Sequence, residues 1–279
     1  MKNLLVCMLL LSGSVFAQKK TTPSPEKAPY DAGTVSALSF RLLGPALTSG
    51  RVADIAVHPQ NKDTWYIAAA AGGLWYTNNH GITFEPIFDN YGSYSLACVT
   101  LAPSNPNTIW VGTGENNNQR SASYGDGVYK SVDGGKSFTN MGLKTSEHIG
   151  KIIVHPTNEN IVWVAAYGPL WSAGGERGVY KTTDGGKTWT RTLFISDNTG
   201  ISDLIIDPSN PDILIAAAHQ RRRHEFTYIG GGPESGLHKS TDGGLTWKEI
   251  NAGLPKGDMG RIGLAISSVD PNYVYAIVE

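Results

Sequence analysis

Side chains suited to ligand binding gather in three long and dissimilar segments of this 279-residue chain. The segments span residues 114–127, 167–178 and 219–236, and they are rich in Gly, Asn, Arg and Glu. Such polar groups make the hydrogen bonds that hold sugars or peptide backbone, and an exposed Trp can stack on a sugar ring. The candidate ligand-binding residues are Glu115, Asn117, Arg120, Trp171, Glu176, Arg177 and Arg222.

These candidates also have structural interpretations. The Asn-rich segment after Glu115 could be a solvated loop that forms hydrogen bonds only within itself, and Trp171 could pack between neighbouring units. Residues 221–223 are three consecutive arginines that could bind a carboxylate through bidentate contacts. Consecutive side chains point in divergent directions, however, so ion pairs with Glu225 or Glu234 are the preferred interpretation of this run.

One phrase of eight residues recurs four times and organises the rest of the chain. It reads Ser/Thr-x-Asp-x-Gly-x-Ser/Thr-aromatic at residues 131–138, 182–189 and 240–247, and a copy at 77–84 carries Asn in place of the Asp. Asp-Gly-Gly permits positive φ and lets a short side chain bond its own backbone, so each phrase predicts a tight hairpin. The residues expected to be structural in these hairpins are Asn79, Asp133, Asp184, Asp242, Trp189 and Trp247.

The hairpins belong to units of four predicted strands that repeat about every fifty residues. The strand-turn-strand that begins each unit occurs five times, at 52–70, 98–114, 151–167, 202–218 and 263–279. Four-stranded units in series predict an all-β fold, a β-propeller with four full blades and half of a fifth. Because an open ring exposes edges and apolar faces, we expect the chain to be the front part of a larger propeller protein.

The strand order also sorts the loops between the two ends of each blade. In a four-stranded meander the first and third turns lie at one end, and the second turn and the links between blades lie at the other. The repeated hairpins therefore belong to one end. The three variable segments share the other end with the links around Tyr91, Glu147, His148 and Asp197, and variable loops on a rigid scaffold are the expected binding face.

The phrase resembles the Asp-box, or bacterial neuraminidase repeat, of sialidases, sortilin-type receptors and some xyloglucan-active glycoside hydrolases. The resemblance extends to residues 40–59, 112–131 and 178–189, which are similar to the large secreted sortilin-like repeat proteins of bacteria, often labelled glycosyl hydrolases. It covers about residues 40–279. It implies that each box is a structural hairpin between the last two strands of a blade, on the face away from the binding site.

A glycoside hydrolase needs two carboxyl groups across the scissile bond. The resemblance to xyloglucan-active enzymes implies one of them just before the Gly-Gly of the first blade, where this chain has Ala70. The remaining possible acids are Asp54, Glu115, Asp126 and Glu176, and nothing pairs any two of them. We therefore expect a propeller that binds protein or glycan; the alternative is a xyloglucanase- or sialidase-like hydrolase whose acids are unidentified or lie beyond Glu279.

The N-terminal segment predicts export. Residues 1–17 have a positive start, a short apolar run and small residues before a cleavage site, which is typical of a signal peptide. The run is too short to span a bilayer. Residues 18–37 form a Pro-rich linker, and residues 38–279 form the blades. The expected location is the periplasm or the outside of the cell.

Composition and residue spacing exclude several classes of partner. A net charge of -1 gives no reason to expect binding to nucleic acid. Neither His148 nor His219 has further ligands at metal-binding spacing, so we expect no metal and no cofactor. Cys98 is the one cysteine after the predicted signal peptide, and its apolar neighbours indicate a buried thiol in a strand.

Overall fold

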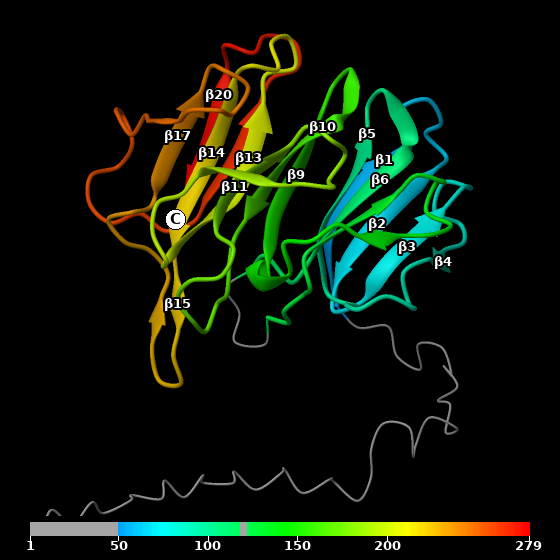
Figure 1. Cartoon of the computed structure of the whole chain (residues 1–279), viewed down its shortest axis with the longest axis horizontal. Coiled ribbons are helices and arrows are strands. Elements are labelled where there is room, and N and C mark those ends of the chain that lie inside the picture. The colour runs from blue at the N-terminus through cyan, green and yellow to red at the C-terminus, as the bar shows by residue number, and fades with distance from the viewer. Residues whose placement is uncertain (1–49, 118–121) are drawn as a thin grey trace, which may run out of the picture. The chain divides into compact units, whose positions relative to one another are not determined.

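The computed structural model describes residues 50–117 and 122–279, so the predicted signal peptide and linker lie outside the described residues. The described part is all-β and forms successive antiparallel sheets (Figure 1). Its helical content is one short 3-10 turn, η1 (Lys144–Ser146). No helix within these residues is long and apolar enough to cross a membrane.

Each of the first four sheets has four strands, as the repeat predicts. The first blade holds β1 (Arg51–Val57), β2 (Trp65–Ala70), β3 (Gly73–Thr77) and β4 (Glu85–Pro86). The second holds β5 (Leu96–Ala102), β6 (Asn105–Thr113), β7 (Val128–Ser131) and β8 (Thr139–Asn140). The third holds β9 (Ile149–His155), β10 (Asn158–Ala166), β11 (Gly178–Thr182) and β12 (Thr190–Leu193).

The fourth blade carries an insertion, and a fifth sheet follows it. The fourth blade holds β13 (Thr199–Ile206), β14 (Leu214–Gln220), β17 (Gly236–Ser240) and β18 (Lys248–Glu249). A separate hairpin of β15 (Arg222–Arg223) and β16 (Tyr228–Ile229) interrupts it after β14. The fifth sheet has β19 (Ile262–Ile266) and β20 (Val274–Val278). The predicted fold, a β-propeller of four-stranded blades with half of a fifth, is confirmed.

The first strand of each blade is the innermost, and consecutive inner strands lie beside one another from β1 through β5, β9 and β13 to β19. Inner strands are sheet edges with unpaired backbone groups. Asp54 and Asp203 satisfy some of them across blades: their carboxylates accept the N–H groups of Val99 (3.3 Å) and Leu264 (2.8 Å). The Lys151 ammonium lies 3.4 Å from the Asp54 carboxylate. Asp54 therefore links the inner strands of the first three blades, which is a structural role.

The hydrophobic core fills the spaces between neighbouring sheets. Trp110 of the second blade and Trp163 of the third are almost fully buried, and they stand on the second strand of their sheets. Trp189 packs edge-on against Trp110 and donates from Nε1 to the Met141 carbonyl (2.8 Å). Cys98 is buried in β5, as predicted, and burial raises the pKa of its thiol to about 12. Aromatic packing thus joins the second blade to the third, whereas aliphatic side chains join the fourth blade to the fifth sheet.

The repeated phrases form the turns between the third and fourth strands. In the second blade, Asp133 accepts hydrogen bonds from the Ser137 N–H (3.0 Å), the Ser137 hydroxyl (2.6 Å) and the Ser131 hydroxyl (2.8 Å). These bonds lower the pKa of the Asp133 carboxyl to about 2. The same bonds recur at Asp184 and Asp242, and Asn79 makes their amide version with Thr83.

Candidate functional site

A cavity of about 530 Å³ opens between the loops of the second and third blades. Four separate segments line it: the β4–β5 link, the 114–127 segment, the η1–β9 link and the 167–178 segment. The lining residues are Gly92, Ser93, Tyr94, Ala122, Ser123, Tyr124, Glu147, His148 and Trp171. A volume of this size falls within the range of small-ligand sites. The cavity lies at the end of the blades for which the sequence predicts binding.

Backbone hydrogen bonds hold these segments together. The Gly125 N–H donates to the Glu147 carbonyl (2.7 Å), and the Glu115 N–H donates to the Ser123 carbonyl (2.9 Å). Gly114 has φ +79°, and a Cβ there would collide with the Glu147 carbonyl oxygen. Only glycine fits at this crossing, because the two loops approach backbone to backbone. The cavity wall is therefore fixed by main-chain contacts.

Three exposed aromatic side chains surround the cavity. Tyr94, Tyr124 and Trp171 are 63%, 73% and 47% exposed. Large aromatic side chains usually lose most of their surface to the core, so three of them on one rim form a surface with ligand-binding character. Their flat apolar faces suit the apolar face of a sugar ring, and their hydroxyl and N–H groups can bond to its hydroxyls.

Glu147 and His148 supply the carboxyl and the imidazole of the cavity. Burial raises the pKa of the half-buried Glu147 carboxyl, although nearby Arg177 acts in the opposite direction. Burial also lowers the pKa of His148 to about 3, helped by Arg221, so its ring is neutral at pH 7. His148 Nδ1 lies 2.7 Å from the Glu115 carbonyl oxygen and therefore donates to it. A raised pKa keeps a carboxyl protonated to a higher pH than that of an ordinary glutamate, which is the direction that a proton donor requires.

The structure turns two sequence-predicted candidates away from the cavity. The Glu115 side chain is buried and forms an ion pair with Arg51 of the first blade. It also accepts a hydrogen bond from Asn117 Nδ2 (2.7 Å). Neither Glu115 nor Asn117 is among the lining residues. Arg120 lies outside the described residues.

Arg177 organises the loop that carries Trp171. Its buried guanidinium donates to the carbonyls of Tyr167 (2.9 Å), Gly174 (2.9 Å), Ser172 (2.9 Å) and Pro169. Burial lowers the pKa of Arg177 to about 10, which leaves it charged at neutral pH. A charged group bonded to four loop carbonyls positions the loop around itself.

The other predicted candidates bond elsewhere. Glu176 accepts hydrogen bonds from the N–H (2.8 Å) and hydroxyl (2.9 Å) of Thr145. Arg222 donates to the Asn198 side chain (2.5 Å), whereas its neighbour Arg221 is buried against the Tyr167 ring. The side chains of Arg221 and Arg222 therefore diverge. Glu234, one of the two predicted ion-pair partners, accepts hydrogen bonds from the hydroxyls of Ser196 and Thr199, and an ion pair with the arginine run stays a prediction. Of the six predicted binding residues that the structure describes, only Trp171 lines the cavity, and its role as a ligand contact stays a prediction.

Sequence reasoning missed most of the cavity wall. It assigned Glu147 and His148 to the correct end of the blades but gave them no role, and it did not single out Tyr94 or Tyr124. The one available signal was a tyrosine within a Ser/Gly-rich stretch, in YGSYS (91–95) and SASYG (121–125). Such stretches are typical of exposed loops, where an aromatic residue has no core to enter.

The possible acids are dispersed. Ala70, at the position that the resemblance implies for a catalytic acid, is buried at the end of β2 and pairs with Arg51. Asp126 accepts a hydrogen bond from the Tyr129 hydroxyl (2.5 Å). Glu147 is the one carboxylate among the described lining residues of the cavity. Within residues 50–117 and 122–279, no group of three or more His, Cys, Asp or Glu could hold a metal ion.

The chain is similar to a receptor family and to a group of carbohydrate-active enzymes. The sequence model of the Sortilin-Vps10 family, described as sortilin, neurotensin receptor 3, matches residues 126–256. A xyloglucanase of Acetivibrio thermocellus is 24% identical over 241 residues, which are 78% of this chain and 28% of that enzyme.

Two solved GH74 enzymes share the fold. The crystal structure of an ancestral GH74 enzyme superposes with a TM-score of 0.60 at 20% identity, covering 81% of this chain and 28% of the other. That of the Niastella koreensis GH74 enzyme has a TM-score of 0.53 at 26% identity, covering 70% and 28%. The chain spans about a quarter of the length of the curated relatives it matches.

Proposed function

We propose that this chain supplies the glycan-binding face of a carbohydrate-active β-propeller of the glycoside hydrolase kind. The observation that carries the proposal is that the exposed side chains of Tyr94, Tyr124 and Trp171 line the same cavity as Glu147. Aromatic faces bind the apolar side of sugar rings, and a carboxyl with a raised pKa can donate a proton to a glycosidic oxygen.

The similarity to xyloglucanases supports a polysaccharide as the ligand and makes xyloglucan the first one to test. Hydrolysis requires a second carboxylate to activate water or attack the sugar. No second carboxylate lines the cavity among its described residues. We therefore assign glycan binding to this chain, and Glu147 is its candidate proton donor for a hydrolytic step.

Binding is tested by titrating the full chain with xyloglucan oligosaccharides in a calorimeter. Trp171→Ala should weaken binding about tenfold, because the loss of one aromatic contact costs roughly 1.4 kcal/mol. Tyr273→Ala is the matched control, since Tyr273 is 60% exposed on the β19–β20 turn, outside the cavity. If no glycan binds, or if Trp171→Ala binds as tightly as the control, the proposed site is wrong.

Turnover is tested separately by measuring new reducing ends. If the chain hydrolyses glycan, Glu147→Gln should abolish the release of reducing ends and leave the dissociation constant within about twofold of the parent, because Gln keeps the shape and loses the proton. Release that survives this substitution would remove Glu147 as the proton donor. Binding without release from the parent chain would leave a glycan-binding module.

A second function, protein binding, is favoured by one observation. The Sortilin-Vps10 match covers residues 126–256, which include the Trp171 loop and the β15–β16 hairpin. An extended peptide could occupy the same aromatic rim. Competition separates the two functions: a bound protein that is not displaced by glycan, together with no glycan binding, would favour a receptor-like module.

A further inference from the structure

The two ring nitrogens of His148 have different surroundings. Nδ1 lies 2.7 Å from the Glu115 carbonyl oxygen. Because a carbonyl oxygen can only accept, Nδ1 carries the proton of the ring. Burial lowers the pKa of His148 to about 3, so the ring holds no second proton at neutral pH. Nε2 is therefore a lone-pair acceptor.

Nε2 has no hydrogen-bond partner among residues 50–117 and 122–279. The described side-chain atoms that lack a partner and are also sealed from water include Trp110 Nε1 but not His148 Nε2. Nε2 is therefore within reach of a molecule outside the protein, and the space that His148 lines is the cavity of about 530 Å³. The residue as a whole is only 1% exposed. A buried residue that keeps one acceptor open to a cavity has the geometry of a ligand contact.

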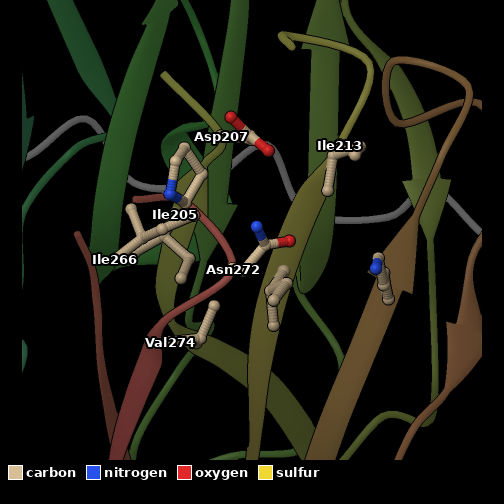
Figure 2. A pocket seen from close by; sticks show the side chains of 9 residues that line it. Ile205, Asp207, Ile213, Ile266, Asn272 and Val274 are labelled. Carbon is tan, nitrogen blue, oxygen red and sulfur yellow. The ribbon is translucent and has the colours of Figure 1, made fainter. Parts of the chain in front are cut away.

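A carboxylate in a second cavity is used differently. That cavity, of about 170 Å³, has walls from the fourth blade and the fifth sheet, and Figure 2 shows Asp207 and Asn272 among its aliphatic side chains. Asp207 Oδ1 accepts hydrogen bonds from the N–H (2.8 Å) and the hydroxyl (2.7 Å) of Ser209. The carboxylate thus serves its own turn, whereas His148 Nε2 serves no described part of the chain.

An unusual backbone conformation brings Glu147 and His148 to the same cavity. In an extended chain, consecutive side chains point in opposite directions. Glu147 has φ +61° and ψ −32°, a conformation that is rare for a residue with a side chain. The change of direction at Glu147 allows both neighbours to line the cavity. Such a conformation persists only where the surrounding structure enforces it.

Hydrogen bonds from two loops enforce this conformation. The Glu147 carbonyl accepts from the Gly125 N–H (2.7 Å). The His148 carbonyl accepts from the Ser146 hydroxyl (2.8 Å) and the Tyr167 N–H (2.9 Å). The main chain that carries the His148 ring is therefore fixed before a ligand arrives. A preformed contact spares the ligand the free energy of ordering it.

We propose that His148 Nε2 is the specificity-determining acceptor of the cavity and takes a hydrogen bond from a sugar hydroxyl. The inference rests on the proposed glycan function and defines the chemistry of its ligand. A sugar ring that contacts Trp171 must present a free hydroxyl to His148. A methyl ether or a carboxylate at that position has no proton to donate, so it leaves Nε2 unpaired and is rejected.

Two substitutions separate this contact from the bond to Glu115. His148→Asn keeps an amide N–H beside Cγ, where Nδ1 lies, and removes the Nε2 acceptor. His148→Gln keeps an amide oxygen near the place of Nε2 and removes the Nδ1 donor. In calorimetric titrations of the full chain with xyloglucan oligosaccharides, His148→Asn should bind about tenfold more weakly, and His148→Gln should stay within about threefold of the parent. A purely structural role for His148 predicts the reverse order.

His224→Asn is the matched control, because His224 is exposed between β15 and β16 and does not line the cavity. The parent chain and Trp171→Ala report on the glycan function itself. If the parent binds and Trp171→Ala weakens binding, but His148→Asn binds as tightly as the control, only the role of His148 is overturned. Absence of binding by the parent chain would overturn both proposals.

Nitrogen NMR of the imidazole ring gives a readout that a structural role would not change. In the free chain, the His148 signals should show a proton on Nδ1 and none on Nε2. A saturating concentration of the oligosaccharides should move the Nε2 signal upfield, because its lone pair accepts a hydrogen bond. The signals are assigned by their loss in His148→Asn. A proton on Nε2 in the free chain, or an Nε2 signal that is unchanged at saturation, would overturn the proposal.

Discussion

The two ends of the blades shift the pKa of a carboxyl group in opposite directions. At the turn end, the Asp133 carboxylate accepts bonds from Ser131 and Ser137, and its pKa falls to about 2. At the loop end, burial removes water from Glu147, and its pKa rises. Hydrogen bonds to the charged form lower the pKa of a carboxyl, whereas partial burial raises it.

The largest expected difference between the two ends is in the stability lost when a tryptophan is replaced by alanine. Trp163 is almost fully buried between the third and fourth blades, so Trp163→Ala should lower the free energy of unfolding by about 3–5 kcal/mol. Trp171→Ala at the loop end should change it by less than about 0.5 kcal/mol, since surface substitutions cost little. Urea unfolding at pH 7 measures both. Equal losses would mean that the Trp171 loop is part of the core.

A smaller effect on the free energy of unfolding is expected from the protonation of His148 at the loop end. The folded pKa of His148 is about 3, well below its ordinary value of 6.5. Below pH 6.5 the unfolded chain therefore binds a proton that the folded chain does not, and stability falls as pH decreases from 6.5 towards 3. At pH 5 this contribution amounts to about 2 kcal/mol.

Urea unfolding of His148→Gln between pH 7 and pH 5 checks this contribution. The variant should lose less stability over this range than the parent chain. The exposed His224 provides the control, because His224→Gln should leave the slope unchanged. A parent slope that His148→Gln does not reduce would show that His148 titrates normally.

The smallest effect on stability is expected from the Asp133 carboxylate at the turn end. The folded pKa of Asp133 lies below its ordinary value of 3.8, so its contribution to stability is present above about pH 4 and is lost as pH falls through 2. Asp133→Asn reproduces the side chain found at Asn79 and should cost only about 0.5 kcal/mol at pH 6, because the site is open to solvent. This difference should vanish near pH 2, as measured by thermal unfolding. A difference that persists at pH 2 would mean that packing, and not charge, distinguishes the two side chains.

Local sequence was sufficient to predict the strands and turns. Asp133 bonds to residues two and four positions away, and the hairpin needs only Gly134 and Gly135 to adopt positive φ. Contacts over such short distances are encoded in a phrase of eight residues, and the repetition of the phrase gives the number and order of the blades. The all-β propeller fold could therefore be predicted before any packing was known.

The candidate site depends on contacts that no local pattern encodes. Glu115 pairs with Arg51, which lies 64 residues earlier, and this contact turns the predicted binding residue inward. The cavity instead joins Tyr94, Tyr124, Glu147 and Trp171 from four segments that meet only when neighbouring blades pack. The sequence by itself determined the blades and the end at which binding is expected. Only tertiary packing decided which side chains line the cavity, because burial and charge pairing depend on the neighbours that each blade receives.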